Sequence, residues 1–348
     1  MIKQRYGELD AIRGIAALFV VLYHYTVQYG AVFGSSIQPI FRFDIGKYGV
    51  ELFFIVSGFV IFLTLNKTKH ASDFVVSRLS RLYPAYWVAI ILTFSMLMIS
   101  PLPHHDITLK DALINLSMLQ KFFHTPNVDG VYWTLIIELS FYIIMYFLFV
   151  TKQLKRIDTI AVAWLFIIIV LNVIEKYYQM HFPSILRFVL MLDYGNLFIA
   201  GILFYKLMQQ AHKRYYVIVL VTLLLEYYLR GAIVYHVMFF YLLFFLFVTN
   251  NLKFIATKPL LYLGMISYSL YLIHQFIGYI IIRWLETHAL LTPITIIIVP
   301  LLISIAIASA MHHFIEKPSL VFIRNKWGNS DLRARLNRTK TTQTSSLS

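Results

Sequence analysis

The first hydrophobic segment carries two ionisable residues, Arg13 and His24, and none of the ten residues between them is charged. On an α-helix, eleven steps of about 100° return to almost the same face, and eleven rises make roughly 16 Å. One helix face would therefore hold a permanent cation near one membrane surface and a titratable imidazole near mid-membrane. Ionisable groups at that depth are costly and usually face a functional cavity. The pattern suits a charged, soluble donor that docks at one surface while chemistry takes place deeper.

Glu51, Glu138 and His274 are further ionisable residues within hydrophobic segments. Counting along each predicted helix places Glu138 and His274 at about the depth of His24, with Glu51 nearer the outer surface. Two imidazoles and a carboxylate at one depth could form a catalytic layer. The alternative for each residue is a structural hydrogen bond to a neighbouring helix. For His274, the aromatic surroundings favour this structural role.

An Arg-x-x-Arg pair, Arg78 and Arg81, precedes Pro84 on the predicted inner side. Residues three apart share a helix face, and guanidinium forks are well shaped for phosphate groups. Composition alone favours the ordinary explanation, which is positive charge at the cytoplasmic surface. A phosphate-binding role for the pair therefore needs support from the rest of the chain.

The composition is that of a membrane protein. The chain of 348 residues is 59% hydrophobic and only 13% charged, against about 25% charged residues in a soluble domain. Hydrophobic runs recur along the whole length, which predicts an all-α integral membrane protein without a sizeable soluble domain. The net charge of +14 fits cytoplasmic loops better than nucleic-acid binding. The absence of cysteine excludes a thiol nucleophile, disulfides and thiolate metal sites.

The hydrophobic pattern predicts about ten transmembrane helices. Their expected limits are 11–31, 48–65, 84–100, 132–150, 158–174, 188–207, 215–229, 232–249, 260–282 and 293–315. With the N-terminus in the cytoplasm, the inner side holds 22 of the 30 Lys and Arg residues, and the outer side holds 8. This asymmetry predicts cytoplasmic termini and an external loop at about 101–131. Residues 1–323 would form the transmembrane domain, and residues 324–348 a polar, disordered cytoplasmic tail.

Several blocks of the sequence resemble the acyltransferase-3 family of integral membrane acyltransferases. Arg13 and His24 match the family's signature of Arg or Lys, ten residues, and His. Four more blocks follow in the right order: Gly49-Val-Glu-Leu-Phe-Phe-Ile-Val-Ser-Gly-Phe59, Ser77-Arg-Leu-Ser-Arg-Leu-Tyr-Pro-Ala-Tyr-Trp87, Trp133-Thr-Leu-Ile-Ile-Glu-Leu-Ser-Phe-Tyr142 and Gly264-Met-Ile-Ser-Tyr-Ser-Leu-Tyr-Leu-Ile-His274. The closing His313-Phe-Ile-Glu-Lys-Pro318 also fits. The block at Gly49 often has Asp where this chain has Glu51, which keeps the carboxylate.

The resemblance covers nearly the whole chain and implies an activity. Such proteins move an acyl group, usually acetyl, from cytoplasmic acyl-CoA to a hydroxyl of a cell-surface polysaccharide or its lipid-linked precursor. This chain resembles the stand-alone members, which lack a fused soluble hydrolase-like domain and lie in the bacterial cytoplasmic (inner) membrane. Acyl transfer to a hydroxyl needs a base and a polar environment for the developing oxyanion. His24, Glu138 and Glu51 are then the candidate catalytic residues, and an imidazole suits a base at neutral pH.

The same resemblance favours a phosphate-binding role for the Arg-x-x-Arg pair over ordinary positive charge at the cytoplasmic surface. Arg78 and Arg81 become candidates for binding the phosphates of acyl-CoA, which in this family is usually acetyl-CoA, with Arg13 as a third contact. The candidate supporting residues are Ser57, Trp133 and His274. The expected partners are a glycan or lipid-linked glycan acceptor and the lipid bilayer, not nucleic acid. His24 could act as a base for direct attack or carry the acyl group transiently, and the sequence leaves both routes open.

Two other features of the sequence concern a metal site and a transport function. His104, His105, Asp106 and His124 gather in the predicted external loop, but a solvated loop explains them better than a metal site, so no metal is expected. A non-enzymatic transporter or flippase for a glycan-linked or acylated lipid is the rival function. Such transporters often have related halves with broken helices at matching positions, and the sequence contains neither feature.

Overall fold

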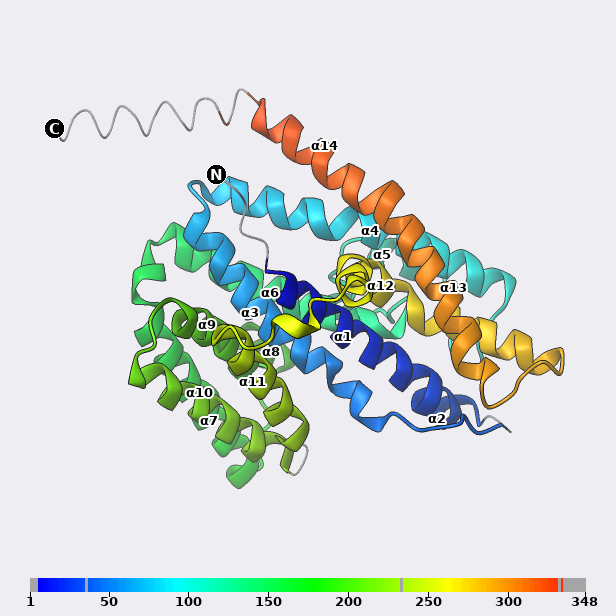
Figure 1. Cartoon of the computed structure of the whole chain (residues 1–348), viewed down its shortest axis with the longest axis horizontal. Helices are drawn as coiled ribbons and strands as arrows, with labels where there is room; N and C mark the ends of the chain where they lie inside the picture. Colours follow the sequence, from blue (N-terminus) through cyan, green and yellow to red (C-terminus); the bar gives the residue numbers. More distant parts are fainter. Residues whose placement is uncertain (1–5, 35–36, 232–233, 331–332, 334–348) are drawn as a thin grey trace.

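The computed structural model describes residues 6–34, 37–231, 234–330 and 333, and within these ranges the chain forms helices and connecting segments without strands. The helices that build the bundle are α1 (Gly7–Tyr23), α3 (Gly49–Lys67), α4 (Ala71–Ile99), α6 (Trp133–Val150), α7 (Ile157–Tyr178), α9 (Gly195–Gln209), α10 (Lys213–Arg230), α11 (Val234–Val248), α12 (Lys258–Thr287) and α13 (Thr295–Met311). Shorter helices are α2 (Tyr29–Phe33), α5 (Leu109–Asn115), α8 (Ser184–Val189) and α14 (Lys317–Gly328). Figure 1 shows how these helices pack side by side.

The described residues make an all-α membrane protein with many spans. Seven helical stretches are long and apolar enough to cross a bilayer by themselves. They are Gly7–Phe33, Asp44–Lys67, Ala71–Ile99, Gly130–Val150, Gln153–Tyr178, Lys258–Thr287 and Thr295–Gly328. The shorter or more polar helices α9, α10 and α11 correspond to the three other predicted spans.

Helices α1 and α12 lie against each other and run parallel. Near the start of both, a Cβ on Gly14 would lie 2.7 Å from the Leu260 carbonyl oxygen and 2.8 Å from the Gly264 nitrogen. Further along, Tyr25 occupies the space that a Cβ on Gly278 would need. Glycine at these positions allows backbone-to-backbone packing, as small residues do between membrane helices. Parallel packing matches the predicted topology, in which α12 is the ninth span and enters from the side where α1 enters.

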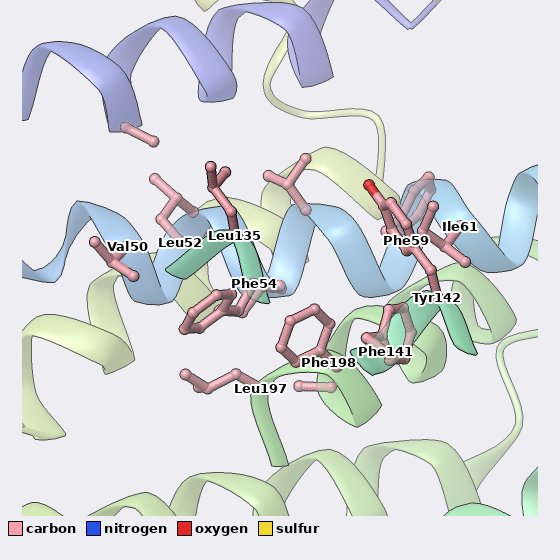
Figure 2. Packing of buried hydrophobic residues seen from close by; sticks show 14 of the residues in the cluster. Val50, Leu52, Phe54, Phe59, Ile61, Leu135, Phe141, Tyr142, Leu197 and Phe198 are labelled. Atoms are coloured by element: carbon pink, nitrogen blue, oxygen red, sulfur yellow. The ribbon is translucent and has the colours of Figure 1, made fainter. Parts of the chain in front are cut away.

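A second close contact joins α3 to α9. A Cβ on Gly58 would collide with the backbone of Phe198, so glycine is required for this approach. Figure 2 shows Phe54, Phe198 and Phe141 meeting between α3, α9 and α6. The ring centroids of Phe54 and Phe198 lie 4.9 Å apart, and those of Phe141 and Phe198 lie 4.4 Å apart. Dispersion between these rings anchors the α7–α11 part of the bundle to α3.

Helix α4 begins at Ala71, well before the limit of 84 that the sequence predicts, and Pro84 lies inside it. Its 29 residues make roughly 43 Å, which exceeds a hydrocarbon core of about 30 Å. Helix α4 is therefore long enough to extend beyond the hydrocarbon core, and the Arg-x-x-Arg pair lies on this continuous helix. Helix α14 continues the chain beyond α13 and extends through Gly328, past the expected boundary at 324. Residues 334–348, where disorder is expected, lie outside the described residues.

The predicted external loop at 101–131 is folded rather than open. Its Asn115 is fully buried and accepts a hydrogen bond of 3.1 Å from the Val128 backbone N–H. The loop also packs back on α4, because the Trp87 indole N–H donates to the Leu116 carbonyl at 3.0 Å. Internal side-chain bonds of this kind satisfy backbone groups that would otherwise lack partners. The loop is thereby held beside the site described next.

Candidate active site

A cavity of about 250 Å³ lies between α1, α3, α4, α6 and α12. Its inner end is lined by Arg13, Arg78 and Arg81. Along α3 it extends from Leu63 to Val50, which is roughly 20 Å at the helical rise. The cavity therefore links the predicted cytoplasmic side to the outer turns of the bundle, and most of the sequence-predicted residues contribute to it.

Arg13 projects from α1 into the inner end of this cavity. Its Nη2 donates a hydrogen bond of 2.9 Å to the Ser267 hydroxyl on α12, and its Nη1 lies 3.8 Å from the Asp10 carboxylate. The close approach of α1 and α12 at Gly14 allows this contact. The cation is held in place but keeps donors that face the cavity, as an anion-binding group needs.

Arg78 and Arg81 line the same end from α4. Arg78 is only 7% exposed and lies 5.8 Å and 5.9 Å from the ring centroids of Phe74 and Tyr142. Its Nη2 donates to the Ser77 hydroxyl at 3.1 Å, and its Nε is buried without a hydrogen-bond partner. Among the described residues, neither arginine forms an ion pair with a carboxylate. Buried charges without a partner are costly, so this end is built for an anion.

Glu138 lies in the arginine cavity and not beside His24. Its Oε1 accepts hydrogen bonds from the hydroxyls of Ser57, at 2.8 Å, and Tyr142. The negative charge of Glu138 acts on Arg13 and on both arginines of α4. Although Glu138 was predicted at the depth of His24, its side chain does not lie beside the His24 ring. Ser57, predicted as a supporting residue, directly orients the Glu138 carboxylate.

His24 and His274 contact each other just outside the lining of this cavity. The His24 Nδ1 and the His274 Nε2 lie 3.3 Å apart, with ring centroids 4.9 Å apart. His274 is fully buried, whereas His24 is partly exposed. Of the two imidazoles, only that of His24 is open to contact with another molecule, and His274 touches it from the buried side.

Hydrogen bonds fix the tautomer of each ring. His274 Nδ1 faces the Tyr271 carbonyl at 2.8 Å, so it carries the proton and leaves Nε2 as an acceptor. His24 Nδ1 faces the Val20 carbonyl at 2.7 Å and the His274 Nε2, so it is also the protonated nitrogen. His24 Nε2 then has a free lone pair and no hydrogen-bond partner within the described part of the chain. This is the nitrogen that a base or nucleophile would use.

His24 is also the first residue of a π-helical segment, η1 (His24–Gln28), that continues α1. Such segments are rare and occur frequently at functional sites. Within η1, Tyr25 donates a hydrogen bond of 2.8 Å to the His274 carbonyl and lies 2.9 Å from the Ser304 hydroxyl of α13. Three helices are thereby joined at the level of the histidines. Hydrophobic patterning gives no sign of this link, and only Gly278 hints that a side chain approaches α12 there.

Asp129 is a second residue that the sequence does not single out. It is fully buried, and its carboxylate accepts hydrogen bonds from the backbone N–H groups of Val131, at 3.2 Å, and Phe276, at 3.1 Å. Burial raises the pKa of Asp129 to about 7, against the smaller opposing effect of these hydrogen bonds. Asp129 thus ties the external loop to α12 two residues beyond His274.

The cavity stops short of the histidine pair. Tyr271 lines it, and the ring centroid of Tyr271 lies 5.7 Å from that of His274 and 5.7 Å from that of Phe53. The Tyr271 hydroxyl is held by Thr134, at 2.8 Å, and by the Val131 carbonyl, at 3.2 Å. The Tyr271 ring, which lines the cavity and packs on His274, therefore lies between the cavity and the histidine pair.

Glu51 and Trp133 lie outside the histidine layer. Glu51, in the first turn of α3, is 7% exposed, and its Oε2 is buried without a hydrogen-bond partner. The opposite charge that acts most strongly on its carboxylate is that of Arg230 on α10. Trp133 is 40% exposed, with its ring centroid 5.7 Å from that of Tyr194. The structure thus places these two residues near the outer ends of α9 and α10.

The remaining candidate features are simple to place. His104, Asp106 and His124 are exposed and His105 is partly exposed, and the described residues contain no group of three or more His, Asp or Glu that could hold a metal ion. The site therefore combines an arginine-lined cavity with a buried pair of imidazoles, one of which has a free lone pair. Such an arrangement can bind a polyanionic donor and move a proton.

Comparison with known proteins agrees with this chemistry. The acyltransferase domain family matches residues 6–313. The chain is 27% identical over 108 residues to the exopolysaccharide production protein ExoZ of Rhizobium meliloti (strain 1021), a match covering 29% of this chain and 33% of the relative. It is 35% identical over 94 residues to protein 2 in the picA locus of Rhizobium radiobacter, covering 26% and 44%. Both matches span less than half of the relative's length, and no solved structure matches. Because the domain match covers most of its length, this chain belongs to the acyltransferase-3 family of membrane acyltransferases.

Proposed function

We propose that the protein is an O-acyltransferase of the bacterial cytoplasmic membrane. It transfers an acyl group, acetyl in the simplest case, from cytoplasmic acyl-CoA to a hydroxyl of a cell-surface polysaccharide or its lipid-linked precursor. The observation that carries the proposal is the arrangement of one cavity, with arginines at its inner end and a histidine pair beyond its aromatic wall. The arginine end offers cations for a phosphate-bearing donor, and the histidine end offers a base for a hydroxyl acceptor.

The donor end suits coenzyme A. The coenzyme carries a pyrophosphate and a 3′-phosphate, and Arg78, Arg81 and Arg13 supply guanidinium forks that bind phosphate well. An extended pantetheine arm would carry the thioester along the cavity toward His24, which lies roughly 16 Å from Arg13 at the helical rise. Glu138 balances part of the arginine charge while the donor is absent.

The chemical step follows from the tautomers. The acceptor hydroxyl donates its proton to His24 Nε2 as its oxygen attacks the thioester carbonyl carbon. The carbon–sulfur bond then breaks, the new ester forms, and the imidazolium returns the proton to the departing CoA thiolate. The His24 Nδ1–H keeps its bond of 2.7 Å to the Val20 carbonyl, with the His274 Nε2 as a weaker second acceptor at 3.3 Å, and the ring therefore stays oriented. The same lone pair of His24 would attack first if an acyl-enzyme intermediate formed.

The acceptor class is supported by the name of one relative, which is an exopolysaccharide production protein. The outer turns beside Glu51 and Trp133 offer a carboxylate and an exposed indole. Carboxylates and aromatic faces are groups that bind sugar hydroxyls and rings through hydrogen bonds and apolar contact. Glu51, with its unpartnered Oε2, is accordingly proposed to orient the acceptor.

The test is acceptor-dependent consumption of a thioester by purified protein in lipid nanodiscs. Acetyl-CoA should release free CoA only when a membrane glycan fraction is present, and the label of the acetyl group should move to the glycan. His24→Ala should abolish this release, whereas the change His288→Ala, at an exposed histidine directly after α12, should not. A lack of thioester consumption with every short acyl-CoA, combined with transport of a glycan lipid across the bilayer, would replace this proposal with a transporter.

A rapid-mixing experiment separates the two chemical routes. Direct attack predicts no CoA release without acceptor. An acyl-enzyme intermediate predicts a burst of one CoA per protein without acceptor, and the burst should disappear in His24→Ala.

A further inference from the structure

Helix α14 lies beyond the part of the chain that the acyltransferase domain matches, yet it packs on the helix that carries the Arg-x-x-Arg pair. Figure 1 shows α14 and α4 running side by side. The Trp327 indole N–H donates a hydrogen bond of 2.7 Å to the Asp73 carboxylate. Arg324 Nη2 donates one of 2.8 Å to the Ser77 hydroxyl. These bonds hold α14 across the inner turns of α4.

Ser77 joins two arginines. Its hydroxyl oxygen accepts from Arg324 at 2.8 Å and from Arg78 at 3.1 Å, so the two guanidinium groups lie on either side of one oxygen. The charge of Arg81 acts on both of them. Three like charges therefore share a small volume next to the cavity, and they repel one another.

Nothing among the described residues neutralises Arg324. It forms no ion pair with a carboxylate there, although Asp73 lies one helical turn from Ser77 and binds Trp327 and Arg333 instead. The Nε atoms of both Arg324 and Arg78 are buried without a hydrogen-bond partner. Buried, unsatisfied guanidinium nitrogens are destabilising unless a ligand supplies acceptors. The missing acceptors must be anionic oxygens, because only they would also relieve the repulsion.

We infer that Arg324 is a fourth cation of the donor site and binds a phosphate of the acyl-CoA together with Arg78. This inference rests on the proposed function, since it names an additional residue for the same donor. Helix α14 would then form one wall of the phosphate site, opposite α4, while Arg13 and Arg81 face the rest of the donor. A phosphate group offers several acceptor oxygens and can receive hydrogen bonds from both guanidinium groups at once.

An anionic lipid headgroup has the same phosphate chemistry, so the experiment separates the two sources. Binding of CoA, 3′-dephospho-CoA and pantetheine would be measured by calorimetry at fixed salt, on the full chain in nanodiscs of zwitterionic lipid. Arg324→Ala should weaken CoA binding about tenfold or more, and Arg324→Lys should recover only part of that loss. Pantetheine, which has no phosphate, should bind Arg324→Ala and wild type equally.

Two control variants make the measurement specific. Lys326→Ala removes the same charge from an exposed position on α14 and should change CoA binding by less than twofold, about the level expected for a screened surface charge. Trp327→Phe removes the bond to Asp73 but keeps Arg324, and it should weaken CoA binding less than Arg324→Ala. An equal loss in Trp327→Phe would mean that α14 is only a structural cover, and the inference would be wrong.

The remaining outcomes are equally decisive. If 3′-dephospho-CoA loses no affinity on Arg324→Ala while CoA does, Arg324 binds the 3′-phosphate; if both lose affinity, it binds the pyrophosphate. Unchanged CoA binding in Arg324→Ala overturns the inference and leaves the proposed function intact. An effect of Arg324→Ala that appears only with phosphatidylglycerol in the nanodisc assigns the residue to lipid and also overturns it. A wild-type protein that neither binds CoA nor consumes thioester would instead refute the proposed function.

Discussion

Buried charges are handled in opposite ways in the two halves of this bundle. Between α9 and α10, the fully buried Glu226 is paired with Arg230 and also accepts a hydrogen bond of 2.7 Å from Asn196. Around α8, the partly exposed Arg187 is likewise paired with both Glu175 and Asp193. In the half formed by α1, α4, α12 and α14, Arg78, Arg81 and Arg324 form no ion pair with a carboxylate of the described residues, and Arg13 has only a long contact of 3.8 Å with Asp10.

The contrast separates structural charge from functional charge. A buried ion pair with complete hydrogen bonds is self-contained, and removal of one partner is strongly destabilising. A cluster of arginines with unsatisfied nitrogens would be stabilised by an anionic ligand, and without one the mutual repulsion of the arginines destabilises the protein. The four predictions below test whether this division holds, beginning with the largest expected effect.

His24→Ala should lower turnover by about 10² to 10⁴, with little change in thermal stability. The Nδ1–H bonds to the carbonyl of its own helix, so truncation leaves few buried groups unpaired. Acetyl-CoA affinity should stay close to that of wild type, because the phosphates bind elsewhere. Acetyl transfer would be followed at equal protein level, with His288→Ala as the control. Near-normal turnover would remove His24 from the catalytic machinery.

Glu226→Ala should lower the free energy of unfolding by about 3–5 kcal/mol and leave CoA affinity unchanged. Arg230 would keep a buried charge without its partner. The double variant Glu226→Met with Arg230→Met should be less destabilised than Glu226→Ala, because no uncompensated charge remains. Thermal unfolding in detergent measures both. A mild effect of Glu226→Ala together with loss of CoA binding would contradict the division between the halves.

Arg78→Ala and Arg81→Ala should each weaken acetyl-CoA binding by about tenfold or more, and Lys should rescue only partly. In contrast to Glu226→Ala, these changes should not lower the melting temperature of the empty protein, since they remove mutual repulsion. Calorimetry and thermal unfolding on the same samples test both halves of the statement. If the variants bind the donor as wild type does, the pair is only a topology signal.

For a step of one pH unit, the pH dependence should be the smallest effect. The pKa of Asp129 is raised to about 7 by burial, so between its unfolded value of about 4 and pH 7 the native state binds more protons than the unfolded state. Stability should therefore fall as pH rises through this window, by at most about 1.4 kcal/mol per pH unit, and level off above it. Asp129→Asn should flatten the profile. An identical profile in Asp129→Asn would show that another group titrates.

The sequence predicted how deep each residue lies along its helix. It did not predict which neighbouring helix each side chain faces. Hydropathy and charge asymmetry predicted the all-α, multi-span fold because burial in lipid imposes a long apolar pattern on every span. The rise per residue correctly put His24 and His274 at one level. The same count put Glu138 there too, yet its side chain turns toward the arginines.

Contacts between helices were beyond the reach of one-dimensional patterns. Nothing local marks Ser77 as the oxygen shared by Arg78 and Arg324, because Arg324 arrives from the opposite end of the chain. Asp129 looked like one polar residue in a polar loop, and only the folded chain brings the Phe276 N–H to it. Both residues act through partners far away in sequence.

The backbone contact between α1 and α12 has a consequence for motion. Gly14 and Gly264 leave no side chain between the two helices, and further along the Tyr25 hydroxyl donates a hydrogen bond to the His274 carbonyl. The two imidazoles therefore belong to one rigid body, and their alignment is set when the protein folds rather than when substrate arrives. Such preorganisation means that no binding energy is diverted to reorienting the base. Admission of the donor must then come from movement of other helices: spin labels on α1 and α12 should keep their separation when CoA binds, while labels on α14 and α6 should not.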